Sequence, residues 1–245
     1  RIVAEDTRRT RQLLTHLGIA GGALERLDAH ARDHDVARVV EALVGGARVA
    51  LVTDAGTPVV SDPGAELVAR AADAGVEILA IPGPSAVVAA LSVSGFAGSF
   101  RFVGFLPRAG VERRDALRDV VEARDVVILF ESPERLRDTL ADLAAPTPQR
   151  RAVVARELTK LHEESVRGSL AELAALDRAW IGEITLVLGP SAPAAAATLD
   201  EAAIDARIDA ELARGRRAKD VAEQLALETN QPRRALYARV LARKR

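Results

Sequence analysis

Short apolar runs alternate with amphipathic stretches along most of the chain, and this alternation is typical of an α/β protein. The clearest example begins with an apolar run at 47–52, which predicts a strand. Two turn-forming clusters follow it, DAGTP at 54–58 and SDPG at 61–64. An amphipathic helix is predicted next, with Pro63 as its first residue. A strand, a glycine turn and a helix in this order present backbone amides and carboxylates to a ligand at the carboxyl end of a sheet.

A second unit of the same kind comes directly after the first. An apolar strand is predicted over 76–81, the turn PGPSA occupies 82–86, and a helix is predicted to continue to about Ser94. Two glycine turns at the ends of successive strands predict one shared small-molecule site.

A helix is also predicted near the start of the chain, from Glu5 to about Leu17, after the end of a strand at 2–4. Asp6 or Thr7 would cap this helix. Its predicted buried stripe consists of Leu13, Leu14 and Leu17. Arginines crowd its first turns, at positions 8, 9 and 11, where cations oppose the helix dipole. An anionic partner and a solvated helix face explain this cluster equally well.

The second half of the chain repeats the alternation. Strands are predicted at 100–106, 126–130, 152–155, 164–167 and 181–188, with helices between several of them. Charged residues follow several of these strands, where α/β folds hold their ligands. Buried ion pairs between sheet and helix are the competing explanation for Arg135 and Arg156.

An Ala/Pro-rich linker at 190–197 leads into a helical tail. Thr198 and Glu201 form a capping box, and apolar residues at helical spacing predict three short helices. This tail resembles a helix-turn-helix, although three helices that protect a domain edge would show the same pattern. From position 207 onward, 11 Lys/Arg face 5 Asp/Glu, a net charge of +6, which leaves −7 for the remainder of a chain whose total is −1. A basic tail on an acidic body favours RNA contact.

Composition sets further limits. The chain has 245 residues, 49% of them hydrophobic, which is enough for one large or two modest domains. It contains no cysteine, so disulfides and thiolate metal sites are excluded and a cytoplasmic location is predicted. The four histidines form no ligand motif, and no metal is expected. No apolar run is long enough to cross a membrane, so no membrane contact is expected. Aromatic residues make up only 3% of the chain, so base stacking is not expected to be a major mode of RNA binding.

Several motifs, in a fixed order, resemble a known family. They are AEDTRRT at 4–10, DAGTPVVSDPG at 54–64, PGPSA at 82–86, GFLP at 104–107, FES at 130–132, RELTK at 156–160 and GE at 182–183. The family is the bacterial 16S rRNA cytidine 2′-O-methyltransferases, a branch of the tetrapyrrole methylase superfamily. The resemblance covers nearly the whole chain, and AEDTRRT together with DAGTPVVSDPG separates this branch from the porphyrin methylases.

This resemblance implies an α/β fold of two domains, 1–97 and 98–190, with S-adenosylmethionine (SAM) in the cleft between them. The helix-turn-helix-like unit at 198–245 follows, and the protein is expected to be a homodimer. Members of the family begin with a strand and a glycine-containing loop ahead of the segment that matches Arg1. Because the chain starts within an apparent strand end and contains no methionine, we expect the natural product to include residues before Arg1.

The resemblance also implies roles for individual residues. Cofactor contacts are expected from the two glycine turns and from the second half of the chain: Asp54, Ala55, Gly56, Thr57, Pro82, Gly83, Ser85, Ala86, Leu106, Pro107, Gly182 and Thr185. RNA contacts, mostly to phosphates, are expected from Arg8, Arg11, Arg108, Arg135, Arg233 and Arg234. A ribose hydroxyl is a poor nucleophile near neutral pH, so a general base or hydrogen-bond acceptor is expected. The candidate catalytic residues are Glu5, Asp6, Glu131, Glu157 and Lys160.

Three functions agree with the sequence. The first is SAM-dependent 2′-O-methylation of a cytidine ribose in the 16S rRNA of the small ribosomal subunit. The second is SAM-dependent methylation of a small molecule such as a tetrapyrrole precursor, which would not need the basic tail. The third is a non-catalytic RNA-binding protein that has kept the fold. Under the first, we expect the assembled subunit rather than naked RNA to be the substrate, because a nearly neutral protein with few aromatic residues depends on a preformed surface.

Overall fold

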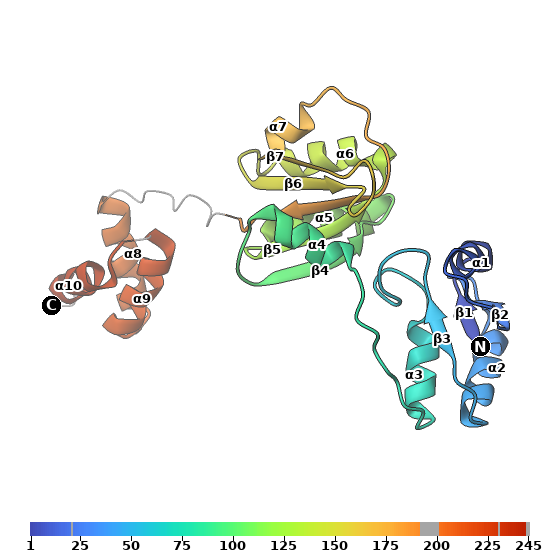
Figure 1. Cartoon of the computed structure of the whole chain (residues 1–245). Helices are drawn as coiled ribbons and strands as arrows, with labels where there is room; N and C mark the ends of the chain where they lie inside the picture. Colours follow the sequence, from blue (N-terminus) through green and yellow to red (C-terminus); the bar gives the residue numbers. More distant parts are fainter. Residues whose placement is uncertain (21, 192–200, 230, 244–245) are drawn as a thin grey trace. The chain divides into compact units, whose positions relative to one another are not determined.

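The computed structural model of the chain describes residues 1–20, 22–191, 201–229 and 231–243 (Figure 1). It divides into two compact units, Arg1–Pro190 and Ser191–Arg245. The first unit contains two separate β-sheets with their helices, and the second contains helices only. The chain is therefore a mixed α/β protein with an added helical unit, as the pattern of apolar and polar positions predicts.

The first sheet has three parallel strands in the order β2-β1-β3. Their bounds are Ile2–Ala4 for β1, Leu24–Arg26 for β2 and Ala50–Val52 for β3. Helices α2 (Asp33–Val44) and α3 (Ala65–Asp73) bury Val36, Val39 and Leu67 in one cluster with Val3 of the central strand. The chain passes from β1 to one neighbour and later to the other, so β1 and β3 flank the point where the strand order reverses.

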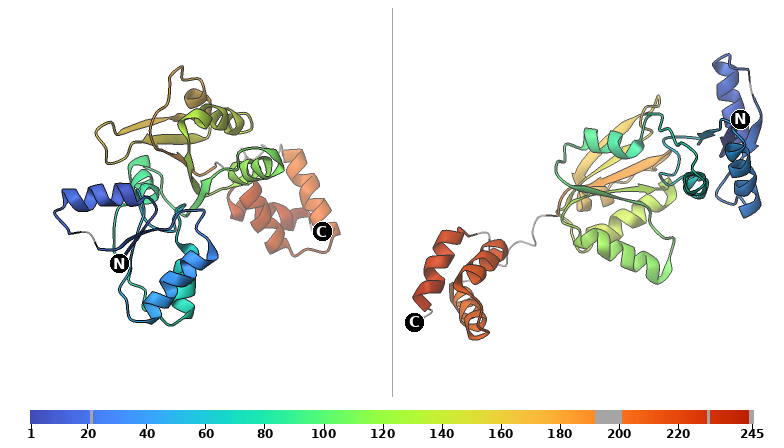
Figure 2. Two further views of the ribbon diagram at one scale, coloured as in Figure 1. Left: turned by 90° about the vertical axis from the view of Figure 1, so that its right-hand side faces the viewer. Right: turned by 90° about the horizontal axis from the view of Figure 1, so that it is seen from below.

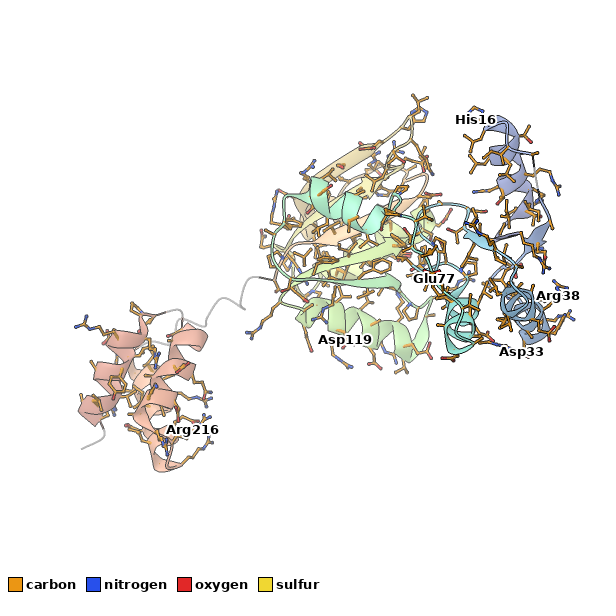
Figure 3. The ribbon with its side chains drawn as sticks, turned by 60° about the horizontal axis from the view of Figure 1, so that its bottom comes forward. His16, Asp33, Arg38, Glu77, Asp119 and Arg216 are labelled. Atoms are coloured by element: carbon orange, nitrogen blue, oxygen red, sulfur yellow. The ribbon has the colours of Figure 1, made fainter. Side chains whose placement is uncertain are left out.

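The segment 76–81, predicted to be a strand, is not one. It follows α3 without forming a ladder, and Ile78, Leu79 and Ile81 are exposed by 49%, 70% and 85% (Figure 3, where Glu77 is labelled). Apolar composition is not sufficient for a strand, because a strand also needs a neighbour that satisfies its backbone groups. Strand β3 is an edge of its sheet, and no described segment pairs with it on the side away from β1. Conversely, β2 was not predicted from the sequence.

Two predictions about helix ends and faces were also wrong. Helix α1 (Thr7–His16) does begin at the cap Asp6, but Leu13 and Leu17 are 50% and 57% exposed, and Thr10 is its buried residue. The apolar spacing was real, yet the sheet does not cover that face. Helix α3 begins after Gly64 rather than at Pro63, because Gly64 adopts φ +121°, outside the helical region.

The second sheet has five strands in the order β4-β5-β8-β6-β7. The bounds are Phe100–Phe105, Val126–Glu131, Ile184–Leu188, Arg151–Arg156 and Glu164–Ser169, in that spatial order. Only β4 and β5 pair in parallel, and the remaining neighbours are antiparallel. The carboxyl ends of β4, β5 and β6 therefore lie at the same edge of the sheet as the amino end of β8.

Helices cover both faces of this sheet (Figure 2). On one face, Val127 and Leu129 pack with residues of α5 (Gly110–Glu122), α6 (Pro133–Ala144) and α7 (Leu170–Ala174). On the other face, Val126 and Ile128 pack with Val87 of α4 (Ala86–Ser94). Successive side chains of a strand point to opposite faces. Burial on both faces explains why β5 is apolar without alternation.

The C-terminal unit consists of α8 (Glu201–Ala213), α9 (Ala218–Thr229) and α10 (Arg233–Arg243). Its core contains Ile204 and Ile208 of α8, Val221 and Leu225 of α9, and Leu236 and Val240 of α10. The three predicted helices are thus present, while Thr198 of the predicted capping box lies outside the described residues. Within the described part of the chain, no helix has the length and apolar character needed to cross a membrane.

Candidate functional site

Two acidic side chains lie at the carboxyl ends of the adjacent strands β1 and β3. Glu5 follows β1, and its Oε2 accepts a hydrogen bond of 3.2 Å from the backbone N–H of Asp54, which follows β3. Arg9 lies 3.4 Å from the Asp54 carboxylate. The crevice outside the strand ends, where the strand order reverses, is the usual ligand position of an open α/β sheet. The first turn cluster therefore begins at such a position.

The two glycine turns are in direct contact. The hydroxyl of Thr57, in the first turn, donates to the carbonyl oxygen of Pro84, in the second, at 3.2 Å. A Cβ added at Gly56 would meet no atom within 4 Å, and at Gly83 the nearest atom would be 4.0 Å away. The backbone of both turns is thus open to the close approach of a ligand. The two turns thus lie together although 76–81 is not a strand, and the small-molecule site that they are expected to share stays a prediction.

The loop between β3 and α3 is strained and packs against the second sheet. Val59 and Ser61 have φ of 75° and 63°, a region that a β-branched residue such as Val59 rarely adopts. Between them, Val60 packs on the apolar cluster that α4 forms with the second sheet. A Cβ added at Gly104 of β4 would lie 3.1 Å from the Ser61 hydroxyl. Such strain persists only where the surroundings fix it, and it is frequent at functional sites.

Asp62 completes this loop. Partial burial raises its pKa, and the negative charges of Glu5, Asp54 and Glu183 raise it further, against a hydrogen bond with Thr53 that lowers it. Asp62 was not among the predicted site residues, although it lies within the SDPG cluster at 61–64. The signal that could have found it is its place in a second turn after the same strand end, close to the carboxylates at the ends of β1 and β3.

At the edge of the second sheet, Glu157 and Glu183 hold Lys160. The ammonium of Lys160 lies 2.9 Å from Glu157 and 3.1 Å from Glu183. Two hydrogen bonds of 2.9 Å also join Glu157 and Glu183. The N–H of Glu157 donates to the carbonyl oxygen of Glu183, and the N–H of Glu183 donates to the carboxylate of Glu157. The Glu183 amide and Lys160 lower the pKa of Glu157. Burial lowers the pKa of Lys160, but its two glutamate partners outweigh this and raise it.

The backbone of this turn is strained as well. Glu157 and Thr159 have φ of 51° and 68°, and Gly182 has φ of 84°. A Cβ at Gly182 would lie 2.5 Å from the Glu157 side chain, so only glycine fits there without displacing Glu157. The RELTK and GE motifs, far apart in sequence, thus form one arrangement that positions Lys160.

Glu131 and Arg135 contact each other and neighbouring residues of the second sheet and α6. Glu131 is 2% exposed and accepts hydrogen bonds from the Thr139 hydroxyl at 2.7 Å and from the Ser132 N–H at 2.9 Å. Arg135 lies 3.4 Å from Glu131 and donates to the carbonyl oxygens of Leu106 and Pro107. This pair therefore fixes the loop after β4, which is the competing explanation weighed for Arg135. Arg156 likewise pairs with Glu164, at 2.7 Å.

The remaining expected residues divide by exposure. Leu106 and Thr185 are buried, whereas the turn residues Asp54, Ala55, Pro82 and Gly182 are accessible. Ser85 and Ala86 begin α4, at its amino end. Asp6 caps α1 and forms an ion pair of 2.7 Å with Arg8, and the side-chain and backbone hydrogen bonds of Arg8 hold the Asp6 pKa well below its usual range.

The basic residues expected to bind RNA lie in different places. Arg8 and Arg11 lie on one exposed face of α1 with Thr15 and His16 (Figure 3, where His16 is labelled). Arg108 is exposed in the loop after β4. Arg233 and Arg234 open α10 of the C-terminal unit. Among the described residues, no group of histidine, aspartate or glutamate side chains could hold a metal ion.

Comparison with known proteins shows the family of the chain. The model of one family, described as Tetrapyrrole (Corrin/Porphyrin) Methylases, matches residues 1–174. The chain belongs to this family. It is thus a member of a methyltransferase family, as the motifs of the two glycine turns and the second sheet indicate.

Relatives of known name support the narrower branch. A protein named Ribosomal RNA small subunit methyltransferase I from Mycobacterium tuberculosis (strain CDC 1551 / Oshkosh) is 43% identical over 252 residues, covering 100% of this chain and 86% of the relative. A protein of the same name from Xylella fastidiosa is 42% identical and covers 96% of this chain and 87% of the relative. This member of the tetrapyrrole methylase family is therefore similar along its whole length to proteins of that name.

Solved structures show the same fold at low identity. The methyltransferase CobJ aligns with a TM-score of 0.54 and 18% identity over 78% of this chain and 94% of its own. Uroporphyrin-III C-methyl transferase from Thermus thermophilus, solved with S-adenyl homocysteine, aligns with a TM-score of 0.51 and 17% identity over 77% and 97%. The predicted tetrapyrrole-methylase-like fold is confirmed.

Proposed function

We propose that this chain transfers a methyl group from SAM to the 2′-hydroxyl of a cytidine ribose in the 16S rRNA of the small ribosomal subunit. The observation that carries this proposal is the similarity over the whole chain to proteins named Ribosomal RNA small subunit methyltransferase I. The structural neighbours named for porphyrin chemistry are only 17–18% identical, a level at which the fold is shared but not the substrate. The small-molecule alternative and the non-catalytic alternative gain no comparable support.

The residues of the two glycine turns would hold SAM. The open backbone at Gly56 and Gly83 can approach the cofactor closely, and the hydroxyl of Thr57 keeps the turns together. When bound, SAM supplies a methyl group on a sulfonium, which is already an activated electrophile. The protein then needs mainly to align the ribose hydroxyl for in-line attack and to accept its proton.

Asp62 is a further candidate for the proton acceptor, because it lies in the turn that follows β3 and close enough to Glu5 and Asp54 to feel their charges. Glu131 is buried and engaged with Thr139, and the low pKa values of Asp6 and Glu157 make both carboxylates weak bases. Asp62 differs because its surroundings raise its pKa, which makes it a stronger base than an ordinary aspartate. Glu5 then acts through its charge on Asp62 and through its hydrogen bond from Asp54.

Lys160 would bind the RNA backbone near the reacting ribose. Its pKa is raised, so the ammonium stays charged, and its side chain is 43% exposed. Glu157 and Glu183 hold that charge in a fixed place rather than cancelling it by full burial. Lys160→Met is expected to weaken RNA binding with little effect on SAM affinity, whereas Lys160→Arg keeps a cation there and loses less.

Methyl transfer from labelled SAM tests the proposal. The acceptors are small ribosomal subunits that lack the modification, naked 16S rRNA and a tetrapyrrole precursor. Label on a cytidine 2′-oxygen of the subunit is the expected result, and stronger labelling of the subunit than of naked RNA is expected too. Label on the tetrapyrrole alone would overturn the proposal. Sedimentation of the same protein tests the homodimer that the family resemblance implies.

A further inference from the structure

Helix α10 has one exposed face that combines apolar and basic side chains. Its buried side carries Leu236 and Val240, which belong to the core of the C-terminal unit. Arg234, Tyr237 and Leu241 are spaced by three and four residues and so lie together on a different face. Tyr237 is 40% exposed and Leu241 is 47% exposed. This face is not part of the core of the unit.

The arginines of α10 differ in what they contact. Arg233 forms an ion pair of 3.3 Å with Glu223 of α9. Arg239 and Arg243 pair with Asp205 and Asp209 of α8, so they hold the helices together. Arg234 is exposed and forms no ion pair with any residue in the described part of the chain. Of the arginines of α10 it is the one left to a partner, and it lies one turn from Tyr237.

Tyr237 is distinctive for a second reason. It is the only tyrosine of the chain, and the other aromatic residues all precede position 181. An aromatic ring that is two-fifths exposed provides a flat surface on which a base can stack, and an adjacent guanidinium suits a phosphate. Two partly exposed apolar side chains offer far less surface than the roughly 800 Å² per partner of a stable protein interface. The face therefore fits a nucleic acid better than a second protein.

We propose that Arg234, Tyr237 and Leu241 bind single-stranded RNA, with Tyr237 stacked on an unpaired base and Arg234 on the adjoining phosphate. This inference rests on the proposed function, which makes RNA the substrate. The low content of aromatic residues argues against base stacking as a major mode of RNA binding. One stacked base needs only one aromatic residue, so a single stacking contact at Tyr237 agrees with this composition. Of the two arginines expected to contact RNA in this helix, the proposal assigns the role to Arg234 and leaves Arg233 to its ion pair with Glu223.

Binding of the full chain to a labelled single-stranded RNA and to the matched duplex tests the surface. Tyr237→Ala is expected to weaken binding of the single strand roughly 5- to 150-fold, while Tyr237→Phe, which keeps the ring, stays close to wild type. Arg234→Ala is expected to reduce the salt dependence of log K by about 0.7, the value for one phosphate contact on a single strand. Arg233→Ala is the matched control, because it removes the same charge from the neighbouring position, and it should change the slope less.

Several results would contradict the proposed binding of RNA by Arg234, Tyr237 and Leu241. Equal losses for Arg233→Ala and Arg234→Ala would show general charge attraction. Unchanged RNA affinity in Tyr237→Ala, together with an altered sedimentation coefficient, would assign the face to a protein partner. Methyl transfer measured on the same variants separates this inference from the proposed function. If the protein methylates RNA but none of the variants changes RNA binding, the RNA-binding role of this face is wrong and the proposed function stands. If the variants change RNA binding as expected but no RNA is methylated, the RNA-binding role of this face is supported and the proposed function is wrong.

Discussion

The hydroxyl of Thr57 donates a 3.2 Å hydrogen bond to the carbonyl oxygen of Pro84, 27 residues further along the chain. This single contact joins two glycine turns that follow different elements of the fold. The segment between α3 and the second turn forms no ladder, so no strand pairing directly fixes the position of that turn. Thr57 therefore supplies a constraint on the proposed SAM site that regular secondary structure does not.

Thr57→Val removes this hydrogen bond while it keeps the shape of the side chain. We expect SAM affinity to fall, by about 0.5–1.5 kcal/mol or roughly 2- to 13-fold, the net value of one such bond. Calorimetric titration with SAM measures the loss. Thr57→Ser, which retains the hydroxyl, is the control and should bind SAM nearly as well as wild type. Equal affinity of Thr57→Val and wild type would show that the turns hold their positions without this bond.

Gly182→Ala tests the arrangement around Lys160. The φ of 84° is unfavourable for alanine, and its Cβ would lie 2.5 Å from the Glu157 side chain. Gly75→Ala is the control, because Gly75 has a φ of 75° but an added Cβ there would meet nothing within 4 Å. Both changes carry a backbone cost of about 1–2 kcal/mol. Only Gly182→Ala also displaces Glu157.

Urea unfolding should therefore show a larger loss for Gly182→Ala than for Gly75→Ala. The double variant Gly182→Ala/Glu157→Ala should recover part of the difference, since the displaced side chain is gone. Equal losses for the two single variants would mean that Glu157 moves aside without cost.

Asp62→Asn is expected to stabilise the protein at neutral pH. Because burial and neighbouring carboxylates raise its pKa above the ordinary value of 3.8, the ionised form of Asp62 is disfavoured in the folded state. The cost of its ionisation therefore grows as the pH rises from the unfolded pKa of 3.8 to the higher folded pKa, and it is constant above that. Thermal unfolding should show a higher Tm for Asp62→Asn at neutral pH and a difference that vanishes well below pH 3.8, where Asp62 is protonated in both states.

The same variant should lose methyl transfer, because an amide cannot accept the ribose proton. Gain of stability with loss of activity is the pattern expected of a residue placed for function. Asp119→Asn, on the exposed side of α5, is the control and should change neither property (Figure 3). A lower Tm for Asp62→Asn at neutral pH would contradict the explanation.

Glu164→Gln should act in the opposite direction. Glu164 accepts hydrogen bonds from Arg178 and Arg156, and these lower its pKa from 4.5 to about 2. Its ionised form therefore adds stability above about pH 4.5, and this contribution is lost as the pH falls towards 2. After discount for solvent screening of a partly exposed carboxylate, we expect a loss of about 1 kcal/mol at neutral pH for Glu164→Gln.

Urea unfolding across the acid range measures this contribution. Glu77→Gln removes a carboxylate from an exposed segment and has no ion pair among the described residues, so its unfolding should match wild type at every pH. A difference between Glu164→Gln and wild type that persists unchanged towards pH 2 would rule out the ionised pair as its cause.

The order and type of most elements followed from the sequence. Strand β5, predicted at 126–130, spans Val126–Glu131, since a continuous apolar run is a local signal. The motifs of the two glycine turns, with those of the second half of the chain, also indicated the family, because such motifs are read directly from the sequence. The strand predicted at 76–81 is absent, because apolar composition is a local property whereas a strand also needs a neighbouring strand to pair with.

The sequence by itself determined the α/β alternation, the separate helical tail and the turns that would receive SAM, all properties of short stretches. Only the tertiary structure decided which charges are free. Glu131 was a candidate catalytic carboxylate and Arg135 a candidate RNA contact, yet they form an ion pair with each other. Asp62 instead lies where partial burial and neighbouring carboxylates raise its pKa. Arg233 and Arg234 are adjacent in sequence, but only Arg233 faces a carboxylate of α9. Charge compensation depends on distances between residues that are remote along the chain, and those distances are set by packing.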